Sequence, residues 1–157
     1  MAGTTPGHDG ALKRAPKAKS CDKRPLNLAL ESLESRDTAN ALDSTTAAAY
    51  GSFADAAVKA GDFRIALEAA ELGIKFDPKQ IWITMNQAHA HMFLGRTEEA
   101  RNEYLAHRGE TGAMGRPWEV TVVRDFRILR EQGREHPLMA EIEQLFKPSL
   151  ADEQPDK

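Results

Sequence analysis

The sequence is poor in cysteine and contains no long apolar run. Cys21 is the only cysteine among 157 residues, which excludes an intramolecular disulfide and a metal site built from several thiolates. Because Cys21 lies among lysines and other polar residues, we interpret its thiol as incidental rather than nucleophilic. No stretch approaches the roughly eighteen apolar residues that cross a bilayer, and no apolar segment follows the basic N-terminus as it does in a signal peptide. We therefore expect a cytoplasmic protein without membrane insertion.

The sequence also lacks the residue patterns that carry catalysis or hold cofactors. Of the five histidines, His89 and His91 point to different faces of a helix, and the others lie on separate elements. No pattern indicates a nucleophile with its base or a pair of carboxylates in a cleft. The TGAMG turn has neither the lysine nor the strand that a phosphate-binding loop requires. We predict a protein that is not an enzyme and that has no cofactor and no metal site.

What is present is the composition of one folded helical domain. The chain is 41% apolar and 29% charged, and its length suits one core. Alanine is frequent in the middle third, and no window alternates apolar and polar residues as a half-buried strand does. The predicted fold class is therefore all-α.

The N-terminal part of the chain differs from the rest in charge and hydropathy. Residues 1–24 carry six basic side chains against two acidic ones and almost no large apolar residue, which predicts a disordered basic tail. Basic residues without interleaved aromatics are more typical of a solubilising tail than of a nucleic-acid-binding segment. In residues 25–42, the spacing of Leu26, Leu30 and Leu33 predicts one short helix followed by a linker. Residues 149–157 are predicted to form a second disordered tail.

Residues 43–112 read as two helical hairpins of the same plan. The first helix begins near Asp43, where Asp43, Ser44 and Thr45 offer capping oxygens, and it stops at Gly61. The second runs from about Asp62 to the step before Pro78. The segment IWITMNQAHAHMFL forms a third helix, and a fourth begins at Thr97. Several pairs of identical residues lie 34 positions apart in these two segments, among them Gly61 and Gly95, Ala54 and Ala88, and Ala66 and Ala100.

This pattern resembles the tetratricopeptide repeat, a helix-turn-helix unit of 34 residues. The first copy matches with Tyr50, Ala54, Gly61, Phe63, Ala66, Ala70 and Pro78, and the second with Ala88, Gly95, Ala100 and Tyr104. The resemblance covers about residues 47–112. It implies an α-solenoid of antiparallel hairpins, in which small residues let paired helices approach closely, and a concave groove that receives peptides.

Residues 113–148 continue the helical pattern outside the register of the repeat. Pro117 takes a good first helical position, and apolar residues recur at helical spacing from Trp118 until Gly133. A last amphipathic segment is ended by Pro148. We interpret the pair as a divergent cap that covers the second hairpin, so that the chain has about six helices.

Candidate binding residues lie on the first helix of each hairpin. On the third helix, Trp82, Met85, His89, Met92 and Phe93 form one stripe, beside Asn86; the corresponding side of the first helix is Ala48, Gly51, Asp55, Val58 and Lys59. The resemblance implies that these sides line the concave groove. From them we select Trp82, Met85, Asn86, His89, Met92, Phe93, Asp55 and Lys59 as partner-binding candidates.

The predicted function is a non-enzymatic scaffold that binds a peptide or helix of another protein in this apolar groove. The stripe on the third helix has a second interpretation beside an open groove: it can be part of the core. Its cover is then either the segment Leu26–Leu42 or a second copy of the chain in a self-associating structural module. A nucleic-acid binder acting through the basic tail is the least favoured interpretation.

Overall fold

The computed structural model describes residues 44–151, so the predicted basic tail, the predicted helix within residues 25–42 and residues 152–157 lie outside the described residues. This part of the chain is all-helical, in agreement with the predicted fold class, and none of its helices is long and apolar enough to cross a membrane. Its helices are α3 (Ser44–Ala60), α4 (Phe63–Phe76), α5 (Ile81–Phe93), α6 (Thr97–Ala106), the 3-10 helix η1 (Ala113–Gly115), α7 (Trp118–Glu131) and α8 (Pro137–Ala151).

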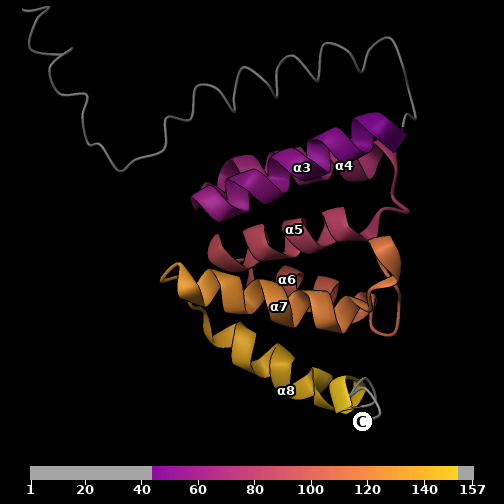
Figure 1. Ribbon diagram of the computed structural model, residues 1–157. Helices are drawn as coiled ribbons and strands as arrows, with labels where there is room; N and C mark the ends of the chain where they lie inside the picture. The colour runs from indigo at the N-terminus through magenta and orange to yellow at the C-terminus, as the bar shows by residue number, and fades with distance from the viewer. Residues whose placement is uncertain (1–43, 152–157) are drawn as a thin grey trace, which may run out of the picture.

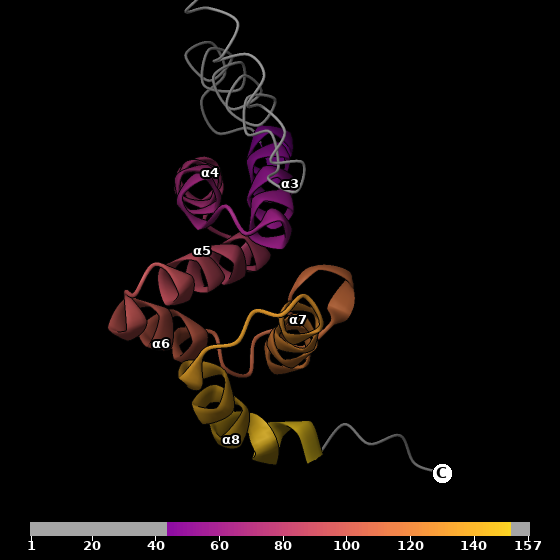
Figure 2. The ribbon, with the colours of Figure 1, turned by 90° about the vertical axis from the view of Figure 1, so that its left-hand side faces the viewer.

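The helices are stacked in pairs along the molecule (Figure 1). Helix α3 packs on α4, both contact α5, and α5 packs on α6. Helix α8 lies against α6 and α7 at the far end of the stack. Viewed from the side, α3 and α7 lie on one side of the molecule, and α4 and α6 lie on the other (Figure 2).

One turn geometry joins the helices of all three pairs. The turn glycines Gly61, Gly95 and Gly133 have φ of 78°, 82° and 78°, a left-handed conformation that favours glycine. In each turn the glycine amide donates to the carbonyl three residues earlier at 2.9–3.2 Å, and the next amide donates to the carbonyl five residues before it at 2.8–2.9 Å. This is the Schellman motif. The pair α7–α8 therefore has the turn of the other two pairs, although Gly133 follows Gly95 by 38 residues.

The core consists of small residues between paired helices and large residues around α7. Of the alanines that recur at the 34-residue spacing, Ala54, Ala66, Ala88 and Ala100 have 0% exposure, as expected for positions where helices approach closely, whereas Ala56, which recurs as Ala90, is exposed. Large side chains attach α7 to the rest of the stack: the Trp118 indole donates to the carbonyl of Tyr104 at 2.8 Å, and the ring of Phe126 meets Tyr104 edge-on at 5.3 Å.

Two predicted helix ends differ from the structure because of proline. Pro117 is the N-cap of α7 with an extended ψ of 144°, so the first helical residue is Trp118. Helix α8 does not end at Pro148 but continues to Ala151, so the predicted disordered tail is helical over residues 149–151. Pro148 has no amide hydrogen to donate to the carbonyl of Gln144. Gln144 is exposed, so water can bind that carbonyl, and Leu150 packs against the core beyond the proline.

Candidate functional site

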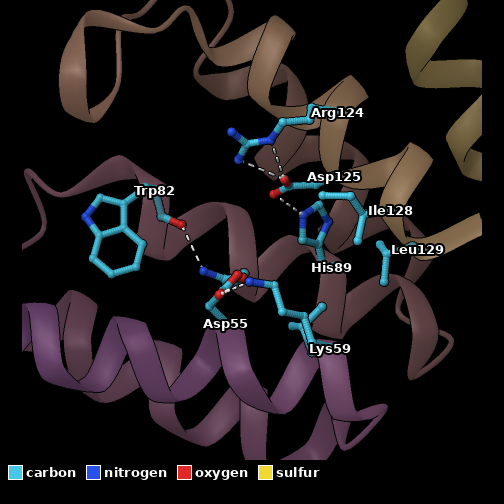
Figure 3. A pocket seen from close by; sticks show the side chains of 10 residues that line it. Asp55, Lys59, Trp82, His89, Arg124, Asp125, Ile128 and Leu129 are labelled. Carbon is cyan, nitrogen blue, oxygen red and sulfur yellow. Dashed lines mark hydrogen bonds and ion pairs between the residues drawn. The ribbon is translucent and has the colours of Figure 1, made fainter. Parts of the chain in front are cut away.

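A groove of about 460 Å³ lies between α3, α5 and α7 (Figure 3). Its walls combine apolar, aromatic and charged side chains. The lining residues are Asp55, Val58 and Lys59 from α3, Trp82, Asn86 and His89 from α5, and Arg124, Asp125, Ile128 and Leu129 from α7. A concave site of this volume, with a few polar groups among apolar ones, is of the size that binds ligands.

Facing walls of the groove each carry one ion pair. On α3, the Lys59 ammonium lies 2.6 Å from the Asp55 carboxylate, one helical turn away. On α7, the Arg124 guanidinium lies 3.1 Å from the Asp125 carboxylate, and Figure 3 shows both pairs directed toward the groove. The Lys59 side chain is 52% exposed and that of Arg124 is 40% exposed. Because exposed ion pairs contribute only about 0–1 kcal/mol, a charged ligand can exchange with either partner.

Trp82 occupies one end of the groove because α3 has a glycine beneath it. A Cβ atom on Gly51 would lie 2.4 Å from the far edge of the Trp82 indole, which is closer than two carbons approach. The indole nitrogen donates to the side-chain oxygen of Gln80 at 3.2 Å. The Asn86 amide donates to the Trp82 carbonyl at 3.3 Å within α5. The small residue on α3 therefore decides where this partly exposed aromatic ring lies.

His89 forms part of the floor of the groove and has both ring nitrogens engaged. Its Nδ1 lies 2.6 Å from the Tyr104 hydroxyl, and its Nε2 lies 3.3 Å from Oδ2 of Asp125. Burial raises the pKa of Tyr104 well above its usual value, so the hydroxyl stays protonated and can donate to Nδ1. A neutral imidazole then donates from Nε2 to Asp125. His89, with 1% exposure, thus connects α5 to α6 and α7.

A contact at one end of the groove joins the first helix pair to the third. The guanidinium of Arg134, directly after the turn between α7 and α8, donates to the carbonyl of Lys59 at 3.0 Å and lies 5.9 Å from the centre of the Phe63 ring. Lys59 lies in the last turn of α3, where backbone carbonyls lack helical partners and carry partial negative charge. Arg134 therefore satisfies a helix end and fixes the distance between α3 and α7.

Comparison with known proteins identifies no relative of this chain. No protein-family model matches it, and searches of curated proteins and of solved structures give no match. Within residues 44–151, no three His, Cys, Asp or Glu side chains lie close enough together to hold a metal ion.

Five of the eight predicted binding residues meet in the groove. Asp55, Lys59, Trp82, Asn86 and His89 line it together. On α5 these residues follow the spacing i, i+4 and i+7, so they share one face of the helix. The residues selected from the sequence pattern therefore lie on two walls of this groove, those formed by α3 and α5.

The other three predicted residues lie outside the groove. Met85 and Met92 are 3% and 0% exposed and belong to the hydrophobic core. Phe93 stacks on Phe63 with ring centroids 4.5 Å apart. The predicted stripe spans a wider arc of α5 than the groove does, so its Met85 and Met92 side is covered by neighbouring helices. This side is therefore core, as one interpretation of the sequence has it, but it packs with residues of α6, α7 and α8 rather than against the two covers proposed from the sequence, the segment Leu26–Leu42 or a second copy of the chain.

Sequence reasoning missed the wall that α7 contributes. This wall consists of Arg124, Asp125, Ile128 and Leu129. From the sequence alone, their helix is interpreted only as part of a cap. The apolar periodicity from Trp118 to Leu129 indicates which side of α7 is buried. It contains no signal for the distance between α7 and α3, because that distance depends on contacts such as Arg134 with Lys59, which are 75 residues apart.

The carboxylate of Asp125 makes the stability of this region dependent on pH. Burial alone raises the pKa of Asp125, but hydrogen bonds and charge from His89 and Arg124 outweigh burial, and its pKa lies below the usual value of 3.8. The ionised form is therefore favoured by folding. Its stabilising contribution is complete above the pKa of the unfolded chain and is lost as pH falls through the lower pKa of the folded protein.

Asp125→Asn is expected to reduce the free energy of unfolding by about 1–2 kcal/mol at pH 7, because a charged hydrogen-bond acceptor becomes neutral. The difference from the wild type should shrink as pH falls through the lowered pKa of the folded wild-type protein, where its carboxyl becomes protonated as well. Urea unfolding at pH 7 and over a series of acidic pH values measures this. Asp55→Asn, the same change in the exposed pair on the facing wall, should cost about 0.5 kcal/mol. An equal loss in both variants contradicts the role of the His89 contact.

Proposed function

We propose that this protein is a non-enzymatic scaffold that binds a peptide segment or helix of a partner protein in the groove between α3, α5 and α7. One observation carries the proposal: every residue that lines the groove comes from the first helix of one of the three pairs. In a stack of helical pairs, the first helices form the concave side, which is the side used for binding in solenoid proteins.

The local structure supports a tetratricopeptide-like α-solenoid for the described residues. In each of the three helix pairs, the two helices are joined by a Schellman turn. Four alanines at the repeat spacing, Ala54, Ala66, Ala88 and Ala100, have no exposed surface. On this interpretation α7 and α8 form a third unit with a longer connection rather than only a cap, and the groove extends over all three units.

The chemistry of the walls defines the kind of peptide that fits. Ile128 offers partly exposed apolar surface next to the buried side chains of Val58 and Leu129, and Trp82 offers an aromatic edge at one end. Lys59 and Arg124 can each exchange the carboxylate of their own helix for one of the ligand. The groove therefore suits an amphipathic segment with two or three apolar side chains and flanking charges. Partly exposed tryptophan is also the residue type that most often dominates binding energy at interfaces.

The burial of His89 and of Tyr104 supports the non-enzymatic part of the proposal, because these two side chains have only 1% and 0% exposure and a ligand in the groove has little access to them. Of the groups that line the groove, the imidazole is the one most suited to move a proton at neutral pH. Its two partners, Tyr104 and Asp125, hold it in the floor as a structural link. Two ion pairs and apolar surface remain accessible in the groove. These groups can bind a peptide.

The test is selection of peptides from a random library displayed on phage, followed by affinity measurement with fluorescently labelled peptides. The groove variant Lys59→Glu with Ile128→Glu reverses one accessible charge and places another on the apolar wall. We expect selected peptides to lose at least tenfold in affinity, about 1.4 kcal/mol, against this variant. Circular dichroism should show unchanged helical content.

The matched control is Lys75→Glu with Leu94→Glu, which repeats both changes outside the groove. Lys75, like Lys59, lies in the last turn of its helix, and Leu94 is 40% exposed. The control should bind the selected peptides as the wild type does. Equal binding by both double variants would falsify the proposed groove. A concentration-dependent dimer that the groove variant alone abolishes indicates the self-associating module instead.

A further inference from the structure

A second apolar surface lies on α3, on a different face from the groove. Ala49, Ser52, Phe53 and Ala56 surround an open hollow of about 340 Å³ with almost no polar surface. Ser52 and Ala56 are exposed, while Ala49 and Phe53 are partly buried against the neighbouring core. Three of the four residues are small, and the ring of Phe53 is the one large group. Such a surface allows the backbone of another helix to approach closely.

The equivalent face of α5 is covered by the preceding helix pair. Counted back from the turn glycine of each pair, the four residues correspond to Ile83, Asn86, Gln87 and Ala90 of α5. Ile83 and Ala90 are 0% exposed and Asn86 is 4% exposed. Helices α3 and α4 supply this cover, because Cβ atoms on Gly51 and Gly73 would lie 2.8 Å and 3.1 Å from Ile83. The open surface of α3 is thus where the stack would place a preceding helix.

The chain has a segment of matching length just before α3. Leu26, Leu30 and Leu33 follow the helical spacing i, i+4 and i+7 in a segment of eight residues, about 12 Å as a helix. The stretch from Ala49 to Ala56 is also eight residues long. The ten residues 34–43 connect this segment to Ser44 and can extend to about 33 Å, enough to reverse the direction of the chain.

We propose that residues 26–33 dock as a helix, antiparallel to α3, on the surface formed by Ala49, Ser52, Phe53 and Ala56. One register aligns the apolar positions of both segments: Leu26 with Ala56, Leu30 with Ser52 and Leu33 with Ala49. The leucines then fill the hollow between the small residues beside Phe53. A tethered segment acts at an effective concentration in the millimolar range, so it outcompetes a second copy of the chain at micromolar concentration.

Disulfide cross-linking in the full chain tests the register. In a Cys21→Ser background, Leu30→Cys with Ser52→Cys places two thiols at the proposed contact, and mild oxidation should join them within one chain. A disulfide requires Cα atoms within about 7 Å. Two control pairs each move one thiol away from the proposed contact. Glu31→Cys with Ser52→Cys places the thiol of the N-terminal segment on another helix face, and Leu30→Cys with Glu68→Cys places the thiol of the folded part on the exposed side of α4. Both control pairs should react at least tenfold more slowly, as followed by intact mass and electrophoresis.

Equal rates for the test pair and the two control pairs overturn the proposal. Cross-links that form only between chains also overturn it, in favour of a second copy on this surface. A second measurement needs no cysteine substitutions, so it tests the proposal even if the cysteine variants do not fold. Hydrogen exchange of the wild-type chain should show residues 26–33 protected at least tenfold, and Ala56→Lys should remove that protection while α5 and α6 stay protected. Absence of protection in the wild type contradicts the docked helix.

Discussion

Phe126→Ala is expected to lower the free energy of unfolding by about 3–5 kcal/mol, the largest loss for any single change considered for this protein. Phe126 has 0% exposure, and its ring contacts Tyr104 at 5.3 Å and His89 at 5.9 Å between ring centroids. Removal of the ring leaves a cavity where α7 meets α5 and α6. Urea unfolding monitored by circular dichroism measures the loss.

The control for this change is Leu145→Ala on α8. Leu145 is 39% exposed, so its truncation should cost much less, about 1 kcal/mol or below. The Phe126 variant should also bind groove-selected peptides more weakly, since Arg124, Asp125 and Ile128 move with α7. A stability equal to that of the Leu145 variant contradicts the attachment of α7 through this ring, and with it the position of one wall of the groove.

Ala66→Leu is expected to cost about 1–3 kcal/mol through overpacking. Ala66 is 0% exposed in α4, and Ala100 has the same burial at the equivalent position of α6. A larger side chain at either site separates helices that approach closely because these residues are small. Thermal and urea unfolding of both single variants should give similar losses.

Ala140→Leu provides the comparison for overpacking. Ala140 is exposed on α8, and leucine and alanine have similar helix propensities, so this variant should remain within about 0.5 kcal/mol of the wild type. If Ala66→Leu and Ala100→Leu are as stable as Ala140→Leu, the small residues do not set the helix spacing, and the tetratricopeptide-like packing is wrong.

The proposed function and the inferred docked helix concern different surfaces of α3. The groove uses Asp55, Val58 and Lys59, whereas the apolar hollow uses Ala49, Ser52, Phe53 and Ala56. Loss of peptide binding in the groove variant therefore leaves the cross-linking result unaffected, and the reverse also holds. In this arrangement α3 has three different faces. The docked segment covers one face, α4 and α5 pack against the second, and the third lines the groove and is open to a ligand.

The sequence by itself was sufficient to locate helices α3 to α8 and the glycine turns between paired helices, except for the helix ends at Pro117 and Pro148. Gly61, Gly95 and Gly133 end helices because glycine adopts the left-handed conformation at little cost, and the step before Pro78 ends α4 because proline disfavours helical geometry there. Ala54, Ala66, Ala88 and Ala100, four of the alanines that recur in the sequence, are fully buried. These are local signals, carried by residues within a few positions of the feature that they determine.

Only the tertiary structure decided which side of α5 is core and which is groove. Trp82 and Met85 are three residues apart and both apolar, yet one lines the groove and the other is buried, because the covering helices come from distant parts of the chain. The partners of His89 lie 15 and 36 residues away, and the contact of Arg134 with Lys59 spans 75 residues. Periodicity determines the faces of each helix, but the site depends on which faces meet, and that follows from packing between residues far apart in the sequence.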